Sequence, residues 1–289
     1  MALDTKTYSL PVARTVGDLR TAIRPWRGDG KTVALVPTMG ALHAGHLSLV
    51  DAVKKRGAKT IVSIFVNPTQ FGPGEDLNAY PRTEATDAEK LSNKADLIFA
   101  PNAAEMYPAD FSTTITVGGI THDLEGAFRP THFAGVATIV AKLILAALPD
   151  IAIFGEKDYQ QLLTIRRMVR DLNIPVEIAG GPIIREQDGL ALSSRNIYLS
   201  AAERAIAGQL NVILKETIQA VTKGASIAEA TATGRARLQE IGFASVDYLD
   251  IRNTASLAPF PSGRPDAPAR LLVAARIGKT RLIDNMPVG

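Results

Sequence analysis

The sequence predicts an α/β fold, a Rossmann-like, doubly wound parallel sheet with a smaller C-terminal α+β domain. Up to residue 183, short apolar runs rich in β-branched residues alternate with segments of helical period. Strands separated by helices form parallel sheets covered on both faces, and the runs lack the polar alternation of half-exposed strands. Beyond residue 183, two long helical segments precede three alternating strands. We therefore expect two domains, residues 1–183 and 184–289.

The individual elements follow from the same periodicities. Strands of the first domain are expected at residues 32–38, 60–66, 96–100, 150–154 and 176–179, and helices at 44–56, 83–94, 133–148 and 158–172. The most hydrophobic segment, 133–148, contains Lys142 and is too short to span a bilayer, so it predicts a buried helix. In the second domain, helices are expected at 201–223 and 227–241, and strands at 245–251, 270–275 and 280–284.

Composition excludes several classes of protein. Hydrophobic residues make up 46% of the 289 residues and charged residues 21%, an ordinary globular mixture. The absence of cysteine excludes disulfides, thiolate zinc sites and cysteine nucleophiles. A net charge of +3 is too small for a nucleic-acid-binding surface. The first ten residues lack the pattern of a signal peptide, so we expect a soluble, cytoplasmic protein without membrane partners.

The most informative segment is PTMGALHAGH, residues 37–46, which leads from the first strand into a helix. Ligands of such sheets bind outside the carboxyl ends of the strands, and a helix amino terminus attracts anions. Gly40 and Gly45 allow close approach of a phosphate or adenine. His43 and His46, half of the chain's 4 histidines, have the spacing of neighbours on one helix face. The glycine spacing disfavours a dinucleotide fingerprint.

Three further segments carry polar residues that suit nucleotide or substrate binding. FGEKDYQQ, residues 154–161, ends the fourth strand and offers Lys157 as a phosphate partner. Asp158 either takes part in binding or only caps the next helix. Gln160 is expected on the helix surface. In LALSSRN, residues 190–196, two hydroxyls and Arg195 suit a polyphosphate. The long loop 65–81 contains Asn67 and Gln70, neutral amides that suit a small substrate with hydroxyl groups.

These segments, in this order, resemble the pantothenate synthetase (pantoate–β-alanine ligase) family of the HxGH nucleotidyltransferase superfamily. LEGAFRPTHFAG at 124–135 and the closing RLIDN also resemble that family, and the likeness runs from about Val36 to Asn285. It implies an AMP-forming ligase that makes an amide bond. Pantoate attacks ATP to give pantoyl adenylate and pyrophosphate, and β-alanine then displaces AMP to give pantothenate, the precursor of coenzyme A. The resemblance also implies MgATP as a substrate and a homodimer.

The resemblance assigns roles residue by residue. His46, as proton donor, and His43, Lys157 and Arg195 would be catalytic. The ATP site would comprise Met39, Gly40, Ala41, Leu42, His43, Ala44, Gly45, His46, Gly155, Glu156, Lys157, Asp158, Ile184, Leu192, Ser193, Ser194 and Arg195. Gln70 and Gln161 would bind pantoate, and Gln70 also β-alanine; no residue is assigned to a resident metal. Leu192 stands where the family often has Met, and Glu125 and Arg129 remain open between dimer contact and substrate cavity.

Three alternative functions are compatible with parts of the same motifs. A nucleotidyltransferase that stops at an adenylylated phosphoester needs a basic pocket, whereas the substrate loop offers amides. A non-catalytic nucleotide-binding module is expected to lose a phosphate-handling residue, yet all are present. A class I aminoacyl-tRNA synthetase needs a basic anticodon-binding appendage, which this sequence lacks. AMP release that requires both pantoate and β-alanine separates the ligase from all three.

Overall fold

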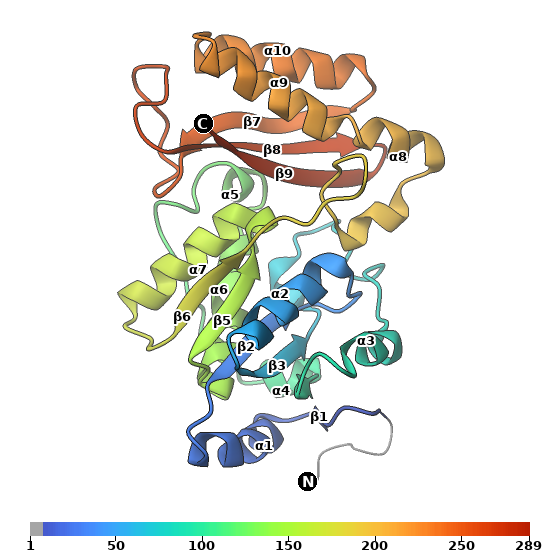
Figure 1. The fold of residues 1–289 in the computed structure, drawn as a ribbon, viewed down its shortest axis with the longest axis vertical. Helices are drawn as coiled ribbons and strands as arrows, with labels where there is room; N and C mark the ends of the chain where they lie inside the picture. Colours follow the sequence, from blue (N-terminus) through green and yellow to red (C-terminus); the bar gives the residue numbers. More distant parts are fainter. Residues whose placement is uncertain (1–7) are drawn as a thin grey trace. The chain divides into compact units, whose positions relative to one another are not determined.

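The computed structural model describes residues 8–289, and its chain divides into two compact units (Figure 1). The first unit comprises the described residues up to Gly118 together with Arg129–Glu156 and Thr164–Pro182. The second comprises Gly119–Phe128, Lys157–Leu163 and Ile183–Gly289. The predicted α/β fold class is confirmed. The division of functions between residues 1–183 and 184–289 stays a prediction. Most of the segment used to judge a signal peptide, residues 1–7, lies outside the described residues.

The first unit is built on a six-stranded sheet in which every neighbouring pair is parallel. Its strands are β1 (Val12–Ala13), β2 (Val33–Thr38), β3 (Lys59–Ile64), β4 (Leu97–Phe99), β5 (Ile151–Gly155) and β6 (Glu177–Gly181). They lie in the order β1-β4-β3-β2-β5-β6. The chain builds outward from β2 through β3 and β4, then returns to place β5 on the other side of β2. That reversal is the switch point at which doubly wound sheets bind ligands.

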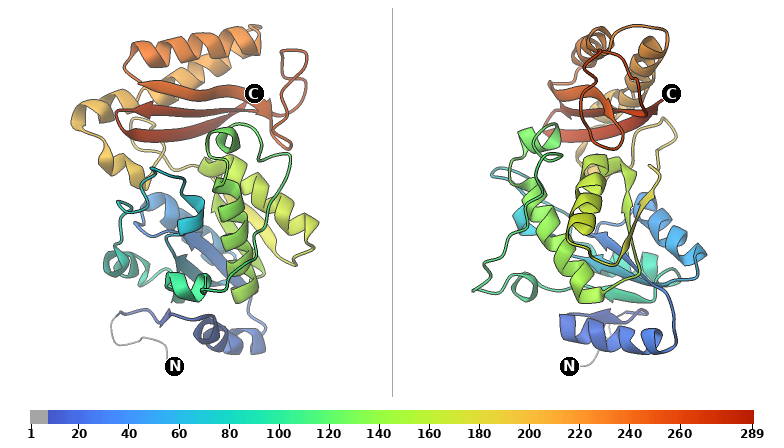
Figure 2. Two further views of the ribbon diagram at one scale, coloured as in Figure 1. Left: turned by 180° about the vertical axis from the view of Figure 1, so that it is seen from behind. Right: turned by 90° about the vertical axis from the view of Figure 1, so that its left-hand side faces the viewer.

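Helices cover both faces of this sheet (Figure 2). They are α1 (Val16–Gly28), α2 (Ala44–Lys55), α3 (Glu84–Leu91), α4 (Ala103–Met106), α6 (His132–Ala147) and, from Thr164 on, α7 (Tyr159–Asp171). The 3-10 turns are η1 (Pro68–Gln70) and η2 (Glu156–Asp158); of η2, only Glu156 belongs to this unit. Leu49 and Val53 of α2 and Leu91 of α3 pack against Ala34 and Val36 of β2 in one apolar core. The predicted buried helix at 133–148 is confirmed, because α6 buries most of its side chains.

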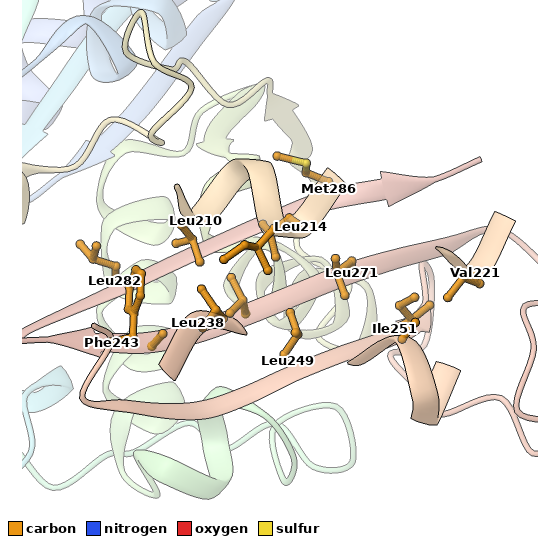
Figure 3. Packing of buried hydrophobic residues seen from close by; sticks show 14 of the residues in the cluster. Leu210, Leu214, Val221, Leu238, Phe243, Leu249, Ile251, Leu271, Leu282 and Met286 are labelled. Atoms are coloured by element: carbon orange, nitrogen blue, oxygen red, sulfur yellow. The ribbon is translucent and has the colours of Figure 1, made fainter. Parts of the chain in front are cut away.

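The second unit packs two helices on a three-stranded antiparallel sheet. Its elements are α5 (Glu125–Phe128), η3 (Ser194–Tyr198), α8 (Ala201–Ala207), α9 (Leu210–Thr222), α10 (Ile227–Glu240), β7 (Ser245–Asn253), β8 (Ala269–Ile277) and β9 (Thr280–Val288). The strands pair in the order β7-β8-β9. Figure 3 shows the apolar core, in which Leu214 of α9 and Leu238 of α10 meet Leu249, Leu271 and Leu282 of the strands.

One local expectation is wrong, and one helix was not predicted. The single helix expected at 201–223 is two helices, since α8 ends at Ala207 and α9 begins at Leu210; a Cβ at Gly208 between them would lie 2.4 Å from the Asp188 carboxylate. No helix was predicted for residues 16–28, where the structure has α1 with Pro25 inside it. A proline usually ends a helical pattern, but α1 continues past Pro25 to Gly28. At its start, Thr15 caps the helix by accepting a hydrogen bond from Asp18 N.

Candidate active site

The turn after β2 adopts an unusual backbone conformation. Gly40 has φ +84° and Ala41 φ +51°, the left-handed region that favours glycine. A Cβ at Gly40 would lie 3.2 Å from both Asp87 Oδ2 and Ile64 Cγ2. Thr38 adds a fixed start to the turn, because its hydroxyl donates to Ser63 O (2.7 Å) and accepts from Gly40 N (3.2 Å). Glycine at position 40 is therefore favoured by its backbone conformation, and the space for a Cβ there is tight.

A buried carboxylate on α3 holds the same turn. Asp87, with none of its surface exposed, accepts hydrogen bonds from Ala41 N (2.9 Å) and Leu42 N (2.8 Å). It also accepts from the Thr83 hydroxyl (3.1 Å). Lys90, one turn further along α3, donates to Leu42 O (2.7 Å). Asp87 lies in a helix without a motif and was not predicted as a site residue, yet it supports the loop that precedes the histidines.

His43 and His46 cap the amino terminus of α2 reciprocally. His43 Nδ1 accepts from Gly45 N (3.2 Å), and His46 Nδ1 accepts from His43 N (3.3 Å). A neutral imidazole whose Nδ1 accepts carries its proton on Nε2, so each ring has an Nε2–H donor. The ring centroids are 4.1 Å apart. Two donors and the positive end of the helix dipole thus gather at the carboxyl end of β2, an arrangement that suits an anion.

Gln70 lies in η1, in the segment that follows β3, and Asn67 orients its amide. Asn67, 1% exposed, donates from Nδ2 to Gln70 Oε1 (3.1 Å), and its own Oδ1 accepts from the hydroxyls of Tyr107 (2.8 Å) and Thr69 (3.0 Å). Because Oε1 of Gln70 is occupied, the side chain presents its Nε2 donors. Nε2 lies 2.9 Å from Met39 Sδ. The loop 65–81 thus contacts the turn after β2 through Gln70 and Met39, and Asn67 orients Gln70.

The backbone of Gln70 is fixed from the start of α6. Its carbonyl accepts from His132 Nδ1 (2.9 Å) and Arg129 Nη2 (3.3 Å). Arg129 in turn forms two hydrogen bonds with the Glu75 carboxylate, at 2.7 and 2.5 Å. Burial raises the pKa of Glu75, but the Arg129 guanidinium outweighs this effect and holds the pKa below its usual range. Arg129, which the sequence left unassigned, is therefore a support of the Gln70 loop.

Gly135 lets α6 approach η1 closely. A Cβ there would lie 2.3 Å from Thr69 O and 2.7 Å from Gln70 N, far inside the distance of an ordinary contact. The carbonyl of Gly135 also accepts from Asn67 Nδ2 (3.2 Å). A hydrogen in place of a side chain at this position is thus what allows the loop to lie against the helix.

The remaining predicted residues fall at the end of β5 and in the second unit. Gly155 ends β5, and Glu156, Lys157 and Asp158 form η2. Lys157, Asp158, Gln161, Ile184 and the segment Leu192–Arg195 belong to the second unit. Ser193 caps η3 by accepting from Arg195 N (3.3 Å). Leu192 N donates to Ile184 O (3.0 Å), so these two predicted nucleotide contacts are neighbours in a hairpin.

Gln160 is not the surface residue that the sequence predicted. It is 5% exposed, and its Nε2 donates to the carbonyls of Ile120 and Asp123, each at 2.8 Å. Its Oε1 accepts from Glu125 N (3.0 Å). Helical period alone could not reveal that the segment 119–128 covers this face of the helix. Gln161, on the same first turn of α7, is half-buried.

Glu125 belongs to a buried charged network in the second unit. It accepts from Arg281 Nη1 (2.7 Å) and from the Tyr248 hydroxyl (3.0 Å), and Arg281 Nε donates to Asp247 (2.7 Å). Burial and the Glu125 carboxylate raise the pKa of Tyr248 well above its ordinary value. Tyr248 therefore remains a neutral donor to Glu125.

Residues 8–289 contain no helix with the length and hydrophobicity needed to cross a membrane. In the same part of the chain, no three His, Asp or Glu side chains gather in a way that would hold a metal ion.

A doubly wound sheet with two histidines capping a helix at its switch point is the arrangement of an α/β protein that binds an anionic ligand there. The profile of the pantoate–β-alanine ligase family matches residues 11–287, so the chain belongs to that family. Pantothenate synthetases of Caulobacter vibrioides and Rhodospirillum rubrum are 55% and 53% identical to it, over 96% and 97% of this chain and 98% and 99% of theirs.

Solved structures agree with this membership. Pantothenate synthetase from Thermus thermophilus matches with a TM-score of 0.90 and 47% identity, over 96% of this chain and 99% of that one. Pantoate–β-alanine ligase from Francisella tularensis, solved in complex with a β,γ-ATP compound and β-alanine, matches with a TM-score of 0.80 and 33% identity, over 96% and 97% of the two chains.

Proposed function

We propose that this chain joins pantoate to β-alanine in two steps, with adenylation first. A pantoate carboxylate oxygen attacks the α-phosphorus of ATP, the bond from that phosphorus to the bridging oxygen breaks, and pyrophosphate leaves. The β-alanine amine then attacks the acyl carbon, its C–O bond to AMP breaks, and a proton leaves the nitrogen. A carboxylate needs no base to attack phosphorus, so the protein's task is positioning and charge stabilisation.

The observation that carries this function is the contact between Gln70 Nε2 and Met39 Sδ. It places an amide that presents donors beside the turn leading to His43 and His46. Donor groups without a full charge hold a carboxylate while leaving its electrons available for attack. Gln161 is proposed as the second pantoate contact, and Gln70 also as the contact for β-alanine.

Nucleotide binding is assigned to both units. Met39–His46, Gly155 and Glu156 supply the contacts of the first unit, with the Nε2–H groups of His43 and His46 meeting phosphate charge. In the second unit, Ile184 is proposed for adenosine, and Lys157, Asp158 and Leu192–Arg195 for the phosphates. Lys157 is a point charge and Arg195 a planar fork, so together they suit a triphosphate.

Mg²⁺ is proposed to enter with ATP, as the MgATP substrate. Magnesium keeps several waters and binds through substrate phosphates together with few protein ligands. Under this proposal it offsets pyrophosphate charge. The homodimer implied by the family resemblance stays a proposal, which sedimentation of the purified protein tests. The expected cytoplasmic location also stays a proposal.

The test is exchange of labelled pyrophosphate into ATP. We expect exchange with pantoate and MgATP alone, because the adenylate forms reversibly before the amine binds. Exchange that also requires β-alanine would exclude the stepwise order. Gln70→Glu, which keeps the size but adds a like charge beside the substrate carboxylate, should raise the KM for pantoate at least about tenfold. Gln219→Glu, exposed on α9, is the matched control; an equal effect of both variants would remove Gln70 from the site.

A further inference from the structure

Two consecutive buried polar residues stand in β9 of the second unit. Asp284 and Asn285 are 3% and 2% exposed, and they close the RLIDN segment. A buried carboxylate beside a buried amide in a strand is costly unless both are fully hydrogen-bonded. Among their partners are Arg185, next to Ile184, and the Lys157 carbonyl, both in segments of this unit that are proposed to hold ATP.

Asp284 anchors the hairpin 184–192. Arg185 Nη1 and Nη2 donate to its two carboxylate oxygens at 2.6 and 2.9 Å, the bidentate geometry in which Arg is most specific. Arg185 also donates to Gly189 O (3.0 Å), across the hairpin. Arg185 follows Ile184 directly and pairs with Ala191, so fixing the guanidinium fixes both sides of the hairpin.

Asn285 anchors Lys157. Its Nδ2 donates to the Lys157 carbonyl (2.9 Å), while its Oδ1 accepts from Arg270 Nη1 (2.5 Å). The Arg270 guanidinium also lies 4.0 Å over the ring of Tyr159, the first residue of α7. The amide of Asn285 is thus held at one end by Arg270 and aimed with its donor at the peptide of Lys157.

We propose that Asp284 and Asn285 are positioning residues for adenylation. Asp284 acts through Arg185 to set the hairpin that carries Ile184 and leads into Leu192–Arg195, and Asn285 acts through the peptide of Lys157 to set its ammonium group. One dipeptide of β9 thereby fixes the distance between the two phosphate-binding segments of the second unit. This inference rests on the proposed assignment of those segments to ATP.

Asn285→Asp is the sharpest test. The variant is isosteric and keeps an acceptor for Arg270, but it replaces the donor that faces Lys157 O with a second acceptor. Two acceptors cannot remain 2.9 Å apart without a proton between them, so the Lys157 peptide must move. We expect the KM for MgATP in pyrophosphate exchange to rise about tenfold, while the KM for pantoate changes less than about twofold.

A second variant and a stability control accompany it. Arg185→Lys keeps the charge but loses the bidentate pairing with Asp284, and should give the same selective loss for MgATP. Leu238→Val, in the fully buried core position of α10, lowers stability without touching either segment. It should leave both KM values unchanged. If Asn285→Asp melts at a lower temperature than Leu238→Val, Arg185→Lys decides the test.

Failure of the proposed function and failure of this positioning role give different results. Parental enzyme without pantoate-dependent exchange, or Lys157→Ala with parental kinetics, overturns the proposed ATP site and this inference with it. If Lys157→Ala is impaired while Asn285→Asp and Arg185→Lys keep the KM for MgATP within about twofold, the positioning role alone is wrong. Equal increases in the KM values for MgATP and pantoate also overturn it, because positioning of these segments acts on the nucleotide.

Discussion

Gly135→Ala should slow pantoate activation while leaving nucleotide binding intact. The added Cβ would lie 2.3 Å from Thr69 O, 2.5 Å from Thr69 C and 2.7 Å from Gln70 N. All three are backbone atoms, so no side-chain rotation relieves the overlap. Since ordinary contact begins at 3.4 Å, the shortfall of 3.4 − 2.3 = 1.1 Å must be met by separating α6 from η1.

A displacement of that size has a predictable cost. A misplacement of about 1 Å in a substrate-positioning group costs about a hundredfold in rate, and overpacking costs about 1–3 kcal/mol in stability. The Asn67 bond to the Gly135 carbonyl, 3.2 Å long, would also be disturbed, and with it the orientation of Gln70. We therefore expect kcat/KM for pantoate to fall about a hundredfold at saturating MgATP.

The assay pairs steady-state kinetics with the rise in melting temperature that MgATP produces, which reports nucleotide binding. Gly28→Ala is the matched control, because Gly28 is the last residue of α1 and a Cβ there meets nothing within 4 Å. The control should retain parental kinetics. A folded Gly135→Ala enzyme within about threefold of the parent would refute the reasoning, as would a loss of the MgATP shift equal to the kinetic loss.

Three further predictions concern the supports and donors of the first unit. Asp87→Asn puts an amide donor against the donors of Ala41 and Leu42, so urea unfolding should show a loss of about 1–3 kcal/mol and adenylation should slow; unchanged stability would exclude Asp87 as the support of this turn. His46→Ala should lower the pyrophosphate exchange rate about a hundredfold to a thousandfold, and a rate within about threefold would remove His46 from the catalytic list. The pKa of Glu75 is lowered in the folded state, so its pairing with Arg129 stabilises the fold. This stabilisation is fully present above the ordinary Glu pKa of about 4.3 and is lost as pH falls through the lower folded pKa. Glu75→Gln should thus cost about 1 kcal/mol at about pH 7, and in urea titrations this cost should shrink as pH falls through the lowered folded pKa of Glu75; a pH-independent difference would contradict this.

The strands and helices that the sequence predicted correctly share one property, an uninterrupted pattern. β2, β3 and β5 are apolar runs bounded by polar or glycine residues, and their expected limits differ from the observed ones by one or two residues. β1 has two residues and contains no periodicity to detect. Its place in the sheet depends on pairing with β4, a contact between Val12 and Ile98 that no local pattern contains.

The candidate site likewise contains residues that local motifs predict and residues that they do not. The histidines and Gln70 stand in motifs that can be read locally. Asp87 lies 46 residues from Ala41, and its role exists only because β2 and β3 are neighbours and α3 follows β3. Asp284 lies 99 residues from Arg185. The RLIDN segment could be seen as similar to the family, but its partners could not be named without the fold. Supports of a site come from distant segments, so they are the part that sequence reasoning misses.

The distribution of charge around Gln70 explains why an amide, and not an arginine, stands beside Met39. A guanidinium lies directly behind it, because Arg129 donates to the Gln70 carbonyl, but its charge is paired with Glu75 at 2.5 and 2.7 Å. A full positive charge on the pantoate carboxylate would stabilise the nucleophile before attack as well as during it, and such uniform binding does not raise the rate. Because Glu75 pairs with Arg129, the guanidinium charge is offset, and Arg129 holds the Gln70 backbone in place. Under the proposed function, the neutral donors of Gln70 hold the carboxylate, while charge-directed donors act at the phosphates, where negative charge develops in the transition state.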